Sequence, residues 1–268
     1  MTQNLLRILL LFFVFGTCCG IQTDARKKNE KKRTPVIRTP EPDPEIIFTP
    51  LHANLTPQDE VMPPADREMR WKEGIDVSHY QHTVDWQAVA RADIAYAYMK
   101  ATEGVSLIDD QYVRNITEAR KAGIKVGSYH FFRAHLSVEE QFKNMTSMVK
   151  KEEQDLLPIV DVEHTNRCST SVLVARLKKF LELLTQHYGK KPILYTFVNF
   201  YNKHLAGRGF DDYPLMVGFY RDAQPELSDG RKYTIWQYTS HGDVPGVDGD
   251  VDRSMIMDGF SLLDILYK

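Results

Sequence analysis

The segment LLPIVDVEH, residues 156–164, joins a continuous apolar run to two acidic side chains. The run has no alternation of polar and apolar residues, which is typical of a strand buried on both faces, as parallel strands are. Asp161 and Glu163 are two residues apart, so in a strand their side chains point to the same face. The segment therefore predicts a buried parallel strand that carries two carboxyl groups at its carboxyl end.

Short apolar segments alternate with segments of helical period from residue 71 onward. The predicted strands are residues 74–77, 94–100, 125–132, 157–163, 192–197, 214–220, 234–238 and 250–256. The predicted helices are residues 85–91, 109–122, 138–151, 171–188 and 198–205. After the sixth strand, residues 221–231 and 239–249 are loops rich in Pro, Gly and Asp. This order predicts an α/β barrel whose last third lacks its outer helices.

Four acidic residues are expected to meet at one end of this barrel. Asp161 and Glu163 end the fourth strand, Asp76 ends the first, and Asp252 belongs to the eighth. The first and eighth strands are neighbours in a closed barrel, and the carboxyl ends of barrel strands form the active-site face. Crowded carboxyl groups repel one another, so one of them tends to keep its proton at neutral pH.

A protonated carboxyl group beside ionised ones is what glycoside cleavage requires. The acid protonates the leaving oxygen, and a carboxylate stabilises the developing positive charge. The alternative is that these acids cap helices or pair with Lys100, Arg133 or Arg253. For any single Asp, capping or ion pairing is the better interpretation. For the pair Asp161 and Glu163, both a catalytic and a structural role stay open.

The composition is that of an ordinary globular protein of 268 residues, 43% of them apolar and 26% charged. A net charge of -2 provides no broad basic field, so nucleic acid is a poor candidate partner. Beyond residue 19 the only cysteine is Cys168, so core burial and not a disulfide framework must stabilise the domain. We expect a monomer.

Residues 1–22 predict an export signal, with one early cation at Arg7, an apolar stretch over residues 8–15 and small residues after it. The stretch is shorter than the roughly 20 residues of a membrane-spanning helix, although an uncleaved anchor stays open. Cys18 and Cys19 lie where exported bacterial lipoproteins carry their lipid. We therefore expect an exported protein, either attached to the cell envelope or secreted.

Residues 23–70 are charged and Pro-rich and lack helical or strand periodicity. Such a composition favours an extended linker over a folded unit. The folded domain is therefore expected over residues 71–268.

Six segments, in this order, resemble the glycoside hydrolase family 25 lysozymes, also called Ch-type lysozymes or muramidases. They are GIDVSHYQHTVDW (74–86), MKATEG (99–104), GSYHFFR (127–133), PIVDVE (158–163), ILYT (193–196) and WQYTSHGDVPGVDGDVD (236–252). The resemblance extends over about residues 74–260. It implies a modified TIM-like barrel of the (β/α)5(β)3 type. It also implies cleavage of the β-1,4 bond between N-acetylmuramic acid and N-acetylglucosamine in peptidoglycan, without a metal or organic cofactor.

The resemblance also implies a role for each acid. Glu163 is similar to the general acid of the family. Asp161 is similar to the residue that orients the 2-acetamido group of the substrate or stabilises its charge. Asp76 and Asp252 resemble flanking carboxylates that tune this pair and hold the sugar.

Aromatic residues within the matching segments are expected to bind sugar, because sugar rings present apolar faces that stack on aromatic planes. These residues are Tyr129, Tyr195, Trp236 and Tyr238. Lys100 also matches the family, either as a substrate contact or as the partner of Glu103 in an ion pair. The histidines of these segments lack the spacing of metal ligands, and no metal is expected.

The sequence departs from the family at three positions. Ser254 stands where an Asn is common, and Met216 and Gly218 stand where a Trp and an Ala are usual. None of these changes touches Asp161 or Glu163, so we expect an active enzyme.

Three other functions compete with this one. A chitinase-type barrel would carry an Asp two residues before Asp161, where this chain has Ile159. A catalytically silent peptidoglycan-binding module is the main alternative, although all four acids are present. A structural or inhibitory envelope protein would leave the acids unexplained.

Overall fold

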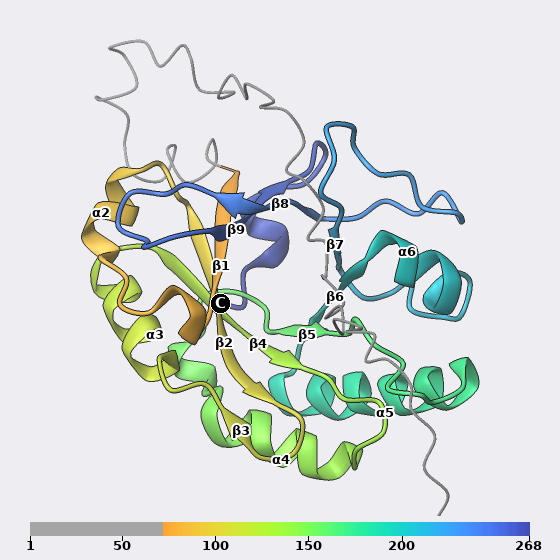
Figure 1. Ribbon diagram of the computed structural model, residues 1–268. Coiled ribbons are helices and arrows are strands. Elements are labelled where there is room, and N and C mark those ends of the chain that lie inside the picture. The colour runs from red at the N-terminus through yellow and green to blue at the C-terminus, as the bar shows by residue number, and fades with distance from the viewer. Residues whose placement is uncertain (1–71) are drawn as a thin grey trace, which may run out of the picture. The chain divides into compact units, whose positions relative to one another are not determined.

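The computed structural model describes residues 72–268, and the predictions for residues 1–22 and 23–70 lie outside the described residues. Eight of the nine strands of one sheet close into a barrel in chain order (Figure 1). They are β1 Glu73–Val77, β2 Tyr96–Glu103, β4 Lys125–Phe131, β5 Ile159–Asp161, β6 Ile193–Phe197, β7 Leu215–Gly218, β8 Ile235–Gly242 and β9 Val251–Ile256. Neighbouring strands are parallel from β1 to β8, and β9 is antiparallel to both β8 and β1.

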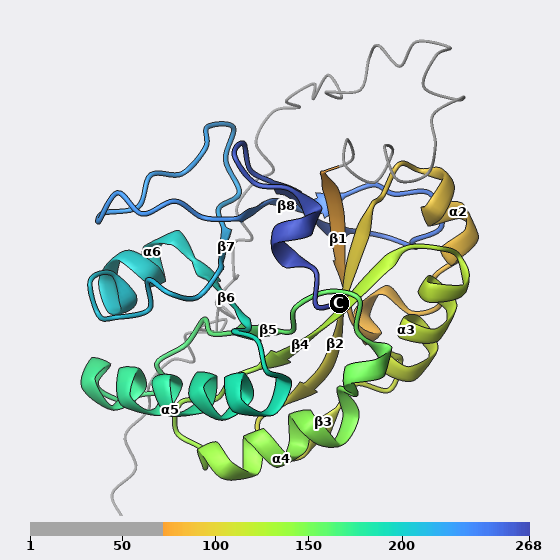
Figure 2. The ribbon, with the colours of Figure 1, turned by 180° about the vertical axis from the view of Figure 1, so that it is seen from behind.

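Helices follow the first five barrel strands and lie outside them (Figures 1 and 2). They are α2 Trp86–Arg91, α3 Tyr112–Lys121, α4 Val138–Met148, α5 Thr170–Tyr188 and the short α6 Val198–Phe200, which continues as the π-helical turn η4 Tyr201–Leu205. The described segments that connect β7, β8 and β9 contain no helix. The (β/α)5(β)3 barrel predicted from the sequence is therefore confirmed.

Local signals set the limits of the longest helix, α5. The hydroxyl group of Ser169 accepts a hydrogen bond from the Val172 amide at 3.3 Å, which caps the first turn. At the other end Gly189 has a left-handed backbone with φ of 76°, which costs glycine no steric strain. The capped helix packs its apolar stripe on the strands, and its first residue follows closely on the segment that carries Asp161 and Glu163.

The strand predicted over residues 157–163 is shorter in the structure, where β5 is Ile159–Asp161. Pro158 has no amide hydrogen to donate, and the Leu157 amide donates to the carbonyl of Ile265 at 2.8 Å instead. Beyond the strand, the Val162 amide still donates to the carbonyl of Tyr195 at 3.0 Å. The chain therefore stays close to β6 as it approaches Glu163.

Four further short elements were not predicted. Strand β3, Leu107–Ile108, adds a two-residue hairpin to β2 outside the barrel. The 3-10 turn η5, Leu262–Ile265, follows β9, and two shorter turns are η2 His79–Gln81 and η3 Lys151–Glu153. These elements are too short to produce a recognisable hydrophobic period.

Aromatic rings fill the barrel interior near the amino-terminal ends of the strands. A Cβ atom on Gly74 would lie 2.1 Å from the Tyr96 ring, and one on Gly127 would lie 2.2 Å from the Tyr98 ring. Glycine is therefore required where these rings cross the strands. Leu262 and other apolar side chains of η5 belong to the same buried cluster. This packing fills the barrel interior near the amino-terminal ends of the strands, at the base of the barrel.

Candidate active site

A cavity of about 230 Å³ lies at the carboxyl ends of the barrel strands. Its walls include all four acids predicted from the sequence: Asp76, Asp161, Glu163 and Asp252. The other lining residues are Ser78, Tyr80, Gln81, Lys100, Tyr129, Phe131, Ile159, Tyr195, Met216, Tyr220 and Gln237. The barrel thus brings together side chains from its first strand to its last.

Asp76 on β1 is buried, with 7% of its surface exposed. Its Oδ2 accepts a hydrogen bond from Gln237 Nε2 at 2.8 Å, and its Oδ1 is buried without a partner among the described residues. Burial and the charge of Asp252 raise the pKa of Asp76 to about 8, although the bond from Gln237 lowers it. Burial raises the pKa of Asp252 to about 6. Asp76 is therefore the member of this pair that holds a proton at pH 7.

Asp161 and Glu163 form the second pair of carboxyl groups. Burial and the charge of Glu163 raise the pKa of Asp161 well above its usual range. Burial and the charge of Asp252 raise the pKa of Glu163 to about 7, while Arg133 and Lys100 lower it. Because burial and the charge of Glu163 both disfavour an ionised Asp161, the pair does not carry two full charges near neutral pH. A carboxylic acid poised in this range suits general acid catalysis.

Lys100 is held at the cavity wall by an ion pair. Its Nζ lies 2.7 Å from Glu103 Oε2, and Arg133 Nε donates to Glu103 Oε1 at 2.9 Å. The Lys100 Nζ and the Arg133 guanidinium lie 5.4 and 4.4 Å from the centre of the Phe131 ring. The ion pair expected between Lys100 and Glu103 is confirmed, and Lys100 also lines the cavity.

Two of the four predicted aromatic residues line the cavity. Tyr195 pairs directly with Asp161 across β6 and β5, and Tyr129 pairs with Ile159 across β4 and β5. Both tyrosines therefore flank the strand that carries Asp161.

The other two aromatic residues, Trp236 and Tyr238, are not brought to the cavity. Gln237 lies between them on β8 and faces inward, so both neighbours face outward. Trp236 Nε1 donates to the carbonyl of Phe219 at 2.8 Å, and the Tyr238 hydroxyl donates to Glu73 Oε2 at 2.7 Å. The structure therefore places these two side chains in the outer packing of the barrel, away from the cavity that Tyr129 and Tyr195 line.

The prediction from the sequence did not include Gln237 or Tyr220, although both side chains line the cavity. The hydroxyl groups of Tyr195 and Tyr220 donate to Gln237 Oε1 at 2.6 and 2.7 Å. The alternation of β8 contains the signal for Gln237, because Ile235, two residues earlier, is part of the barrel interior. Tyr220 follows β7 in an irregular segment, where alternation gives no guidance.

The three departures from the family pattern have different surroundings. Ser254 Oγ lies 3.0 Å from the Tyr96 hydroxyl, so it completes the packed base. Met216 lines the cavity. A Cβ atom on Gly218 would lie 2.7 Å from the Tyr195 hydroxyl oxygen. Gly218 thus leaves the space that this hydroxyl occupies.

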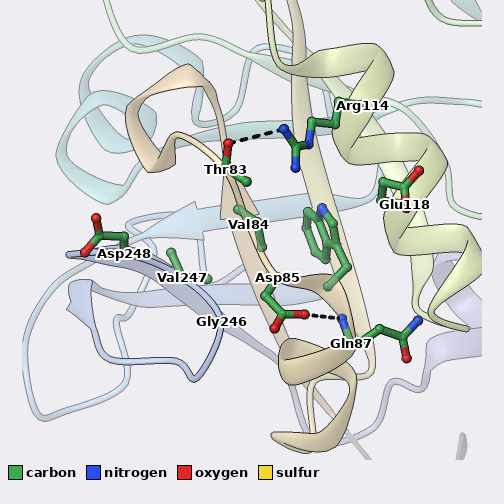
Figure 3. Close-up of a pocket in the computed structure, with 10 residues that line it drawn as sticks. Thr83, Val84, Asp85, Gln87, Arg114, Glu118, Gly246, Val247 and Asp248 are labelled. Atoms are coloured by element: carbon green, nitrogen blue, oxygen red, sulfur yellow. Dashed lines mark hydrogen bonds between the residues drawn. The ribbon is translucent and has the colours of Figure 1, made fainter.

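A second hollow, of about 720 Å³, lies outside the barrel (Figure 3). It is bordered by α2, α3 and the connection between β8 and β9. Asp85 caps α2 by accepting a hydrogen bond from the Gln87 amide at 3.1 Å, and Arg114 donates to the Thr83 hydroxyl at 3.3 Å. The predicted site residues are not part of its wall. The barrel cavity is therefore the candidate active site.

Comparisons with known proteins agree with this geometry. Residues 75–247 match the family described as glycosyl hydrolases family 25. The uncharacterized protein YegX of Escherichia coli (strain K12) is 35% identical over 184 residues, which are 67% of this chain and 67% of that protein. Lysozyme M1 of Streptomyces globisporus is 30% identical over 215 residues, which are 74% of this chain and 71% of that protein.

A solved structure shows the same barrel. The bacterial lysozyme from Streptomyces coelicolor superposes with a TM-score of 0.66 and 29% sequence identity, over 72% of this chain and 94% of that one. The family match over residues 75–247 includes the segments that carry Asp76, Asp161 and Glu163. This chain therefore belongs to glycosyl hydrolase family 25.

Proposed function

We propose that this protein is an N-acetylmuramidase, a lysozyme that cleaves the β-1,4 bond between N-acetylmuramic acid and N-acetylglucosamine. Family membership implies a peptidoglycan substrate. The observation that carries the proposal is the cavity in which four carboxyl groups meet. Burial and the charge of Asp252 raise the pKa of Glu163 in this cavity to about 7.

Glu163 acts as the general acid. Its carboxyl proton passes to the glycosidic oxygen while the bond between that oxygen and the anomeric carbon breaks. Water then adds to the anomeric carbon and returns a proton to Glu163, so that one water is consumed for each bond cleaved. Lys100 lowers the pKa of Glu163, which keeps the acid strong enough to donate.

Asp161 acts on the positive charge that develops at the anomeric carbon. It lies in the same cavity wall as Glu163, between the neighbouring strands that carry Phe131 and Tyr195. In the neighbouring-group route, the 2-acetamido oxygen of the substrate bonds to the anomeric carbon as the glycosidic bond breaks, and the water that later adds to this carbon breaks that bond again. Asp161 holds the amide nitrogen and stabilises the charge that it acquires in between. Asp76 and Asp252, on the other side of the cavity, hold the sugar.

We also propose that the protein is exported, either to the cell envelope or into the medium. Peptidoglycan lies outside the cytoplasmic membrane, so a peptidoglycan hydrolase must cross that membrane to reach its substrate. Residues 1–22 supply the corresponding sequence pattern.

The test is incubation of purified peptidoglycan with the full chain, with a Glu163→Gln variant and with a Tyr267→Phe control. Tyr267 donates its hydroxyl to the carbonyl of Tyr188, at the end of α5 remote from the cavity. We expect soluble fragments from the wild type and the control, and a loss of roughly 100- to 10,000-fold for Glu163→Gln. Binding to peptidoglycan without release of fragments by the wild type would instead favour the silent wall-binding module.

A further inference from the structure

We infer that Gln237 is a positioning residue whose amide, oriented by the hydroxyl groups of Tyr195 and Tyr220, holds the Asp76 carboxyl group in the cavity. The catalytic meaning of this arrangement rests on the proposed function. The hydrogen bonds themselves do not, and they can be tested separately.

The orientation of the Gln237 amide follows from its partners. A neutral tyrosine hydroxyl has one proton to donate, and an amide oxygen can accept two hydrogen bonds. Both Tyr195 and Tyr220 are directed at Oε1, at 2.6 and 2.7 Å. With Oε1 occupied in this way, Nε2 faces Asp76, where it lies 2.8 Å from Oδ2. In this orientation Nε2 can donate to Asp76 in both its neutral and its ionised form, whereas the reverse orientation would set Oε1 against the carboxylate once Asp76 ionises.

Asp76 depends on this contact for its placement. Gln237 Nε2 is the side-chain hydrogen-bond partner that the structure shows for Asp76 among the described residues, and Gln237 itself is only 4% exposed. Because Oδ2 accepts from Nε2, the proton of the neutral acid belongs on Oδ1, which is buried and has no partner within the described chain. The hydrogen bond from Gln237 thus fixes which oxygen of the neutral Asp76 carries the proton.

Other titratable and charged groups lie close enough to Asp76 to interact with its charge or share its cavity wall. They are Tyr96, Tyr98, Tyr129, Asp161, Asp252 and Tyr220, with Lys100 and Glu163 in the same cavity wall. Of these groups, the charge of Asp252 disfavours an ionised Asp76, and burial acts in the same direction. Gln237 acts in the opposite direction, because a donated hydrogen bond stabilises the carboxylate form.

The hydrogen bond from Tyr195 to Gln237 also gives a role to Gly218. A Cβ atom at this position would lie 2.7 Å from the Tyr195 hydroxyl oxygen and 2.9 Å from the Phe197 ring. The missing side chain therefore allows the Tyr195 hydroxyl to reach Gln237. Tyr220, which is 41% exposed, supplies the second donor from the rim of the cavity.

The experiment measures the titration of the Asp76 carboxyl group by carbon-13 NMR in the full chain, with the signal assigned by an Asp76→Asn variant. Gln237→Met removes the donor, and a double variant, Tyr195→Phe with Tyr220→Phe, leaves Gln237 intact but frees its amide to turn. Tyr267→Phe is the matched control, because its hydroxyl bonds a backbone carbonyl remote from the cavity. The pH dependence of kcat and KM is recorded for the same proteins.

We expect Gln237→Met to raise the pKa of Asp76 by on the order of one unit. We expect the double variant to shift it in the same direction, and each single Tyr→Phe variant to shift it less. The control should leave it unchanged. If peptidoglycan is hydrolysed, kcat should fall by about ten- to a hundredfold for Gln237→Met, with a smaller change in KM.

An unchanged Asp76 titration in folded Gln237→Met, or in the double variant should Gln237→Met fail to fold, would overturn the inference. A wild type that does not hydrolyse peptidoglycan overturns the proposed function, while the NMR titration still decides whether Gln237 holds Asp76.

Discussion

Asp76 on β1 and Asp252 on β9 stand directly opposite each other in an antiparallel pair. Side chains of directly opposed residues lie on the same face of the sheet, here the inner face of the barrel mouth. Two ionised carboxylates at this separation would repel each other, and burial makes the repulsion costly. The pair therefore carries a proton at neutral pH, on Asp76.

Stability is expected to fall as the pH rises because of Asp76. Its pKa is raised from 3.8 to about 8, so its contribution is complete below pH 3.8 and is lost as the pH rises through about 8. Asp76→Asn, which mimics the neutral acid, should make the free energy of unfolding less dependent on pH in this window. Each unit of pKa shift corresponds to about 1.4 kcal/mol, so the difference should reach a few kcal/mol at pH 8. Urea unfolding at pH 5 and pH 8 measures it, and parallel profiles would contradict the assignment.

Activity is expected to decline above about pH 7, as Glu163 loses its proton. Lys100 lowers the pKa of Glu163, so Lys100→Met should move the alkaline limb of kcat/KM to higher pH. Lys121→Met is the matched control, because Lys121 forms an exposed ion pair with Glu118 on α3. An alkaline limb that stays in place in Lys100→Met would remove Lys100 from the electrostatics of the acid.

A methyl group at Gly218 is expected to disturb the cavity. Its Cβ would lie 2.7 Å from the Tyr195 hydroxyl oxygen and 2.9 Å from the Phe197 ring, closer than such atoms normally approach. We expect Gly218→Ala to destabilise the fold by about 1–3 kcal/mol and to lower kcat. Thermal unfolding and steady-state kinetics measure both effects. Wild-type values for both would mean that the Tyr195 hydroxyl does not need this space.

Tyr80 is expected to bind the glycan beyond the cleaved bond. It lines the cavity, yet it is 73% exposed, so its ring is available for stacking on a sugar face. Tyr80→Ala should raise KM several-fold with little change in kcat, as expected for a contact made equally in the ground state and the transition state. Leu263→Ala is a control, because Leu263 is also exposed but lies on η5. Equal KM values for Tyr80→Ala and the wild type would exclude this contact.

The sequence predicted the barrel and its four acids because both depend on local rules. The spacing of Asp161 and Glu163, and the order of strands, follow from alternation and from the closure of the sheet. The same rule, applied to β8 from Ile235, places Gln237 inside and Trp236 and Tyr238 outside. Trp236 and Tyr238 therefore do not line the cavity, and a contact of either residue with sugar stays a prediction.

Other features of the site depend on contacts between distant segments. Tyr220 and Gln237 are 17 residues apart and meet only when the segment after β7 folds over the mouth. The raised pKa of Glu163 depends on its burial and on Asp252, which belongs to the last strand. The contact between Tyr220 and Gln237 has no periodic or compositional signal in the sequence. The meeting of the four acids does have one, but it does not say which of them keeps a proton.

The most direct test of the account is the identity of the sugar at the new reducing end. Purified peptidoglycan digested with the full chain is reduced with borohydride, and the fragments are analysed by mass spectrometry beside those from Glu163→Gln. The account predicts reduced N-acetylmuramic acid from the wild type and no fragments above background from Glu163→Gln. Reduced N-acetylglucosamine, or equal fragment yields from both proteins, would contradict it.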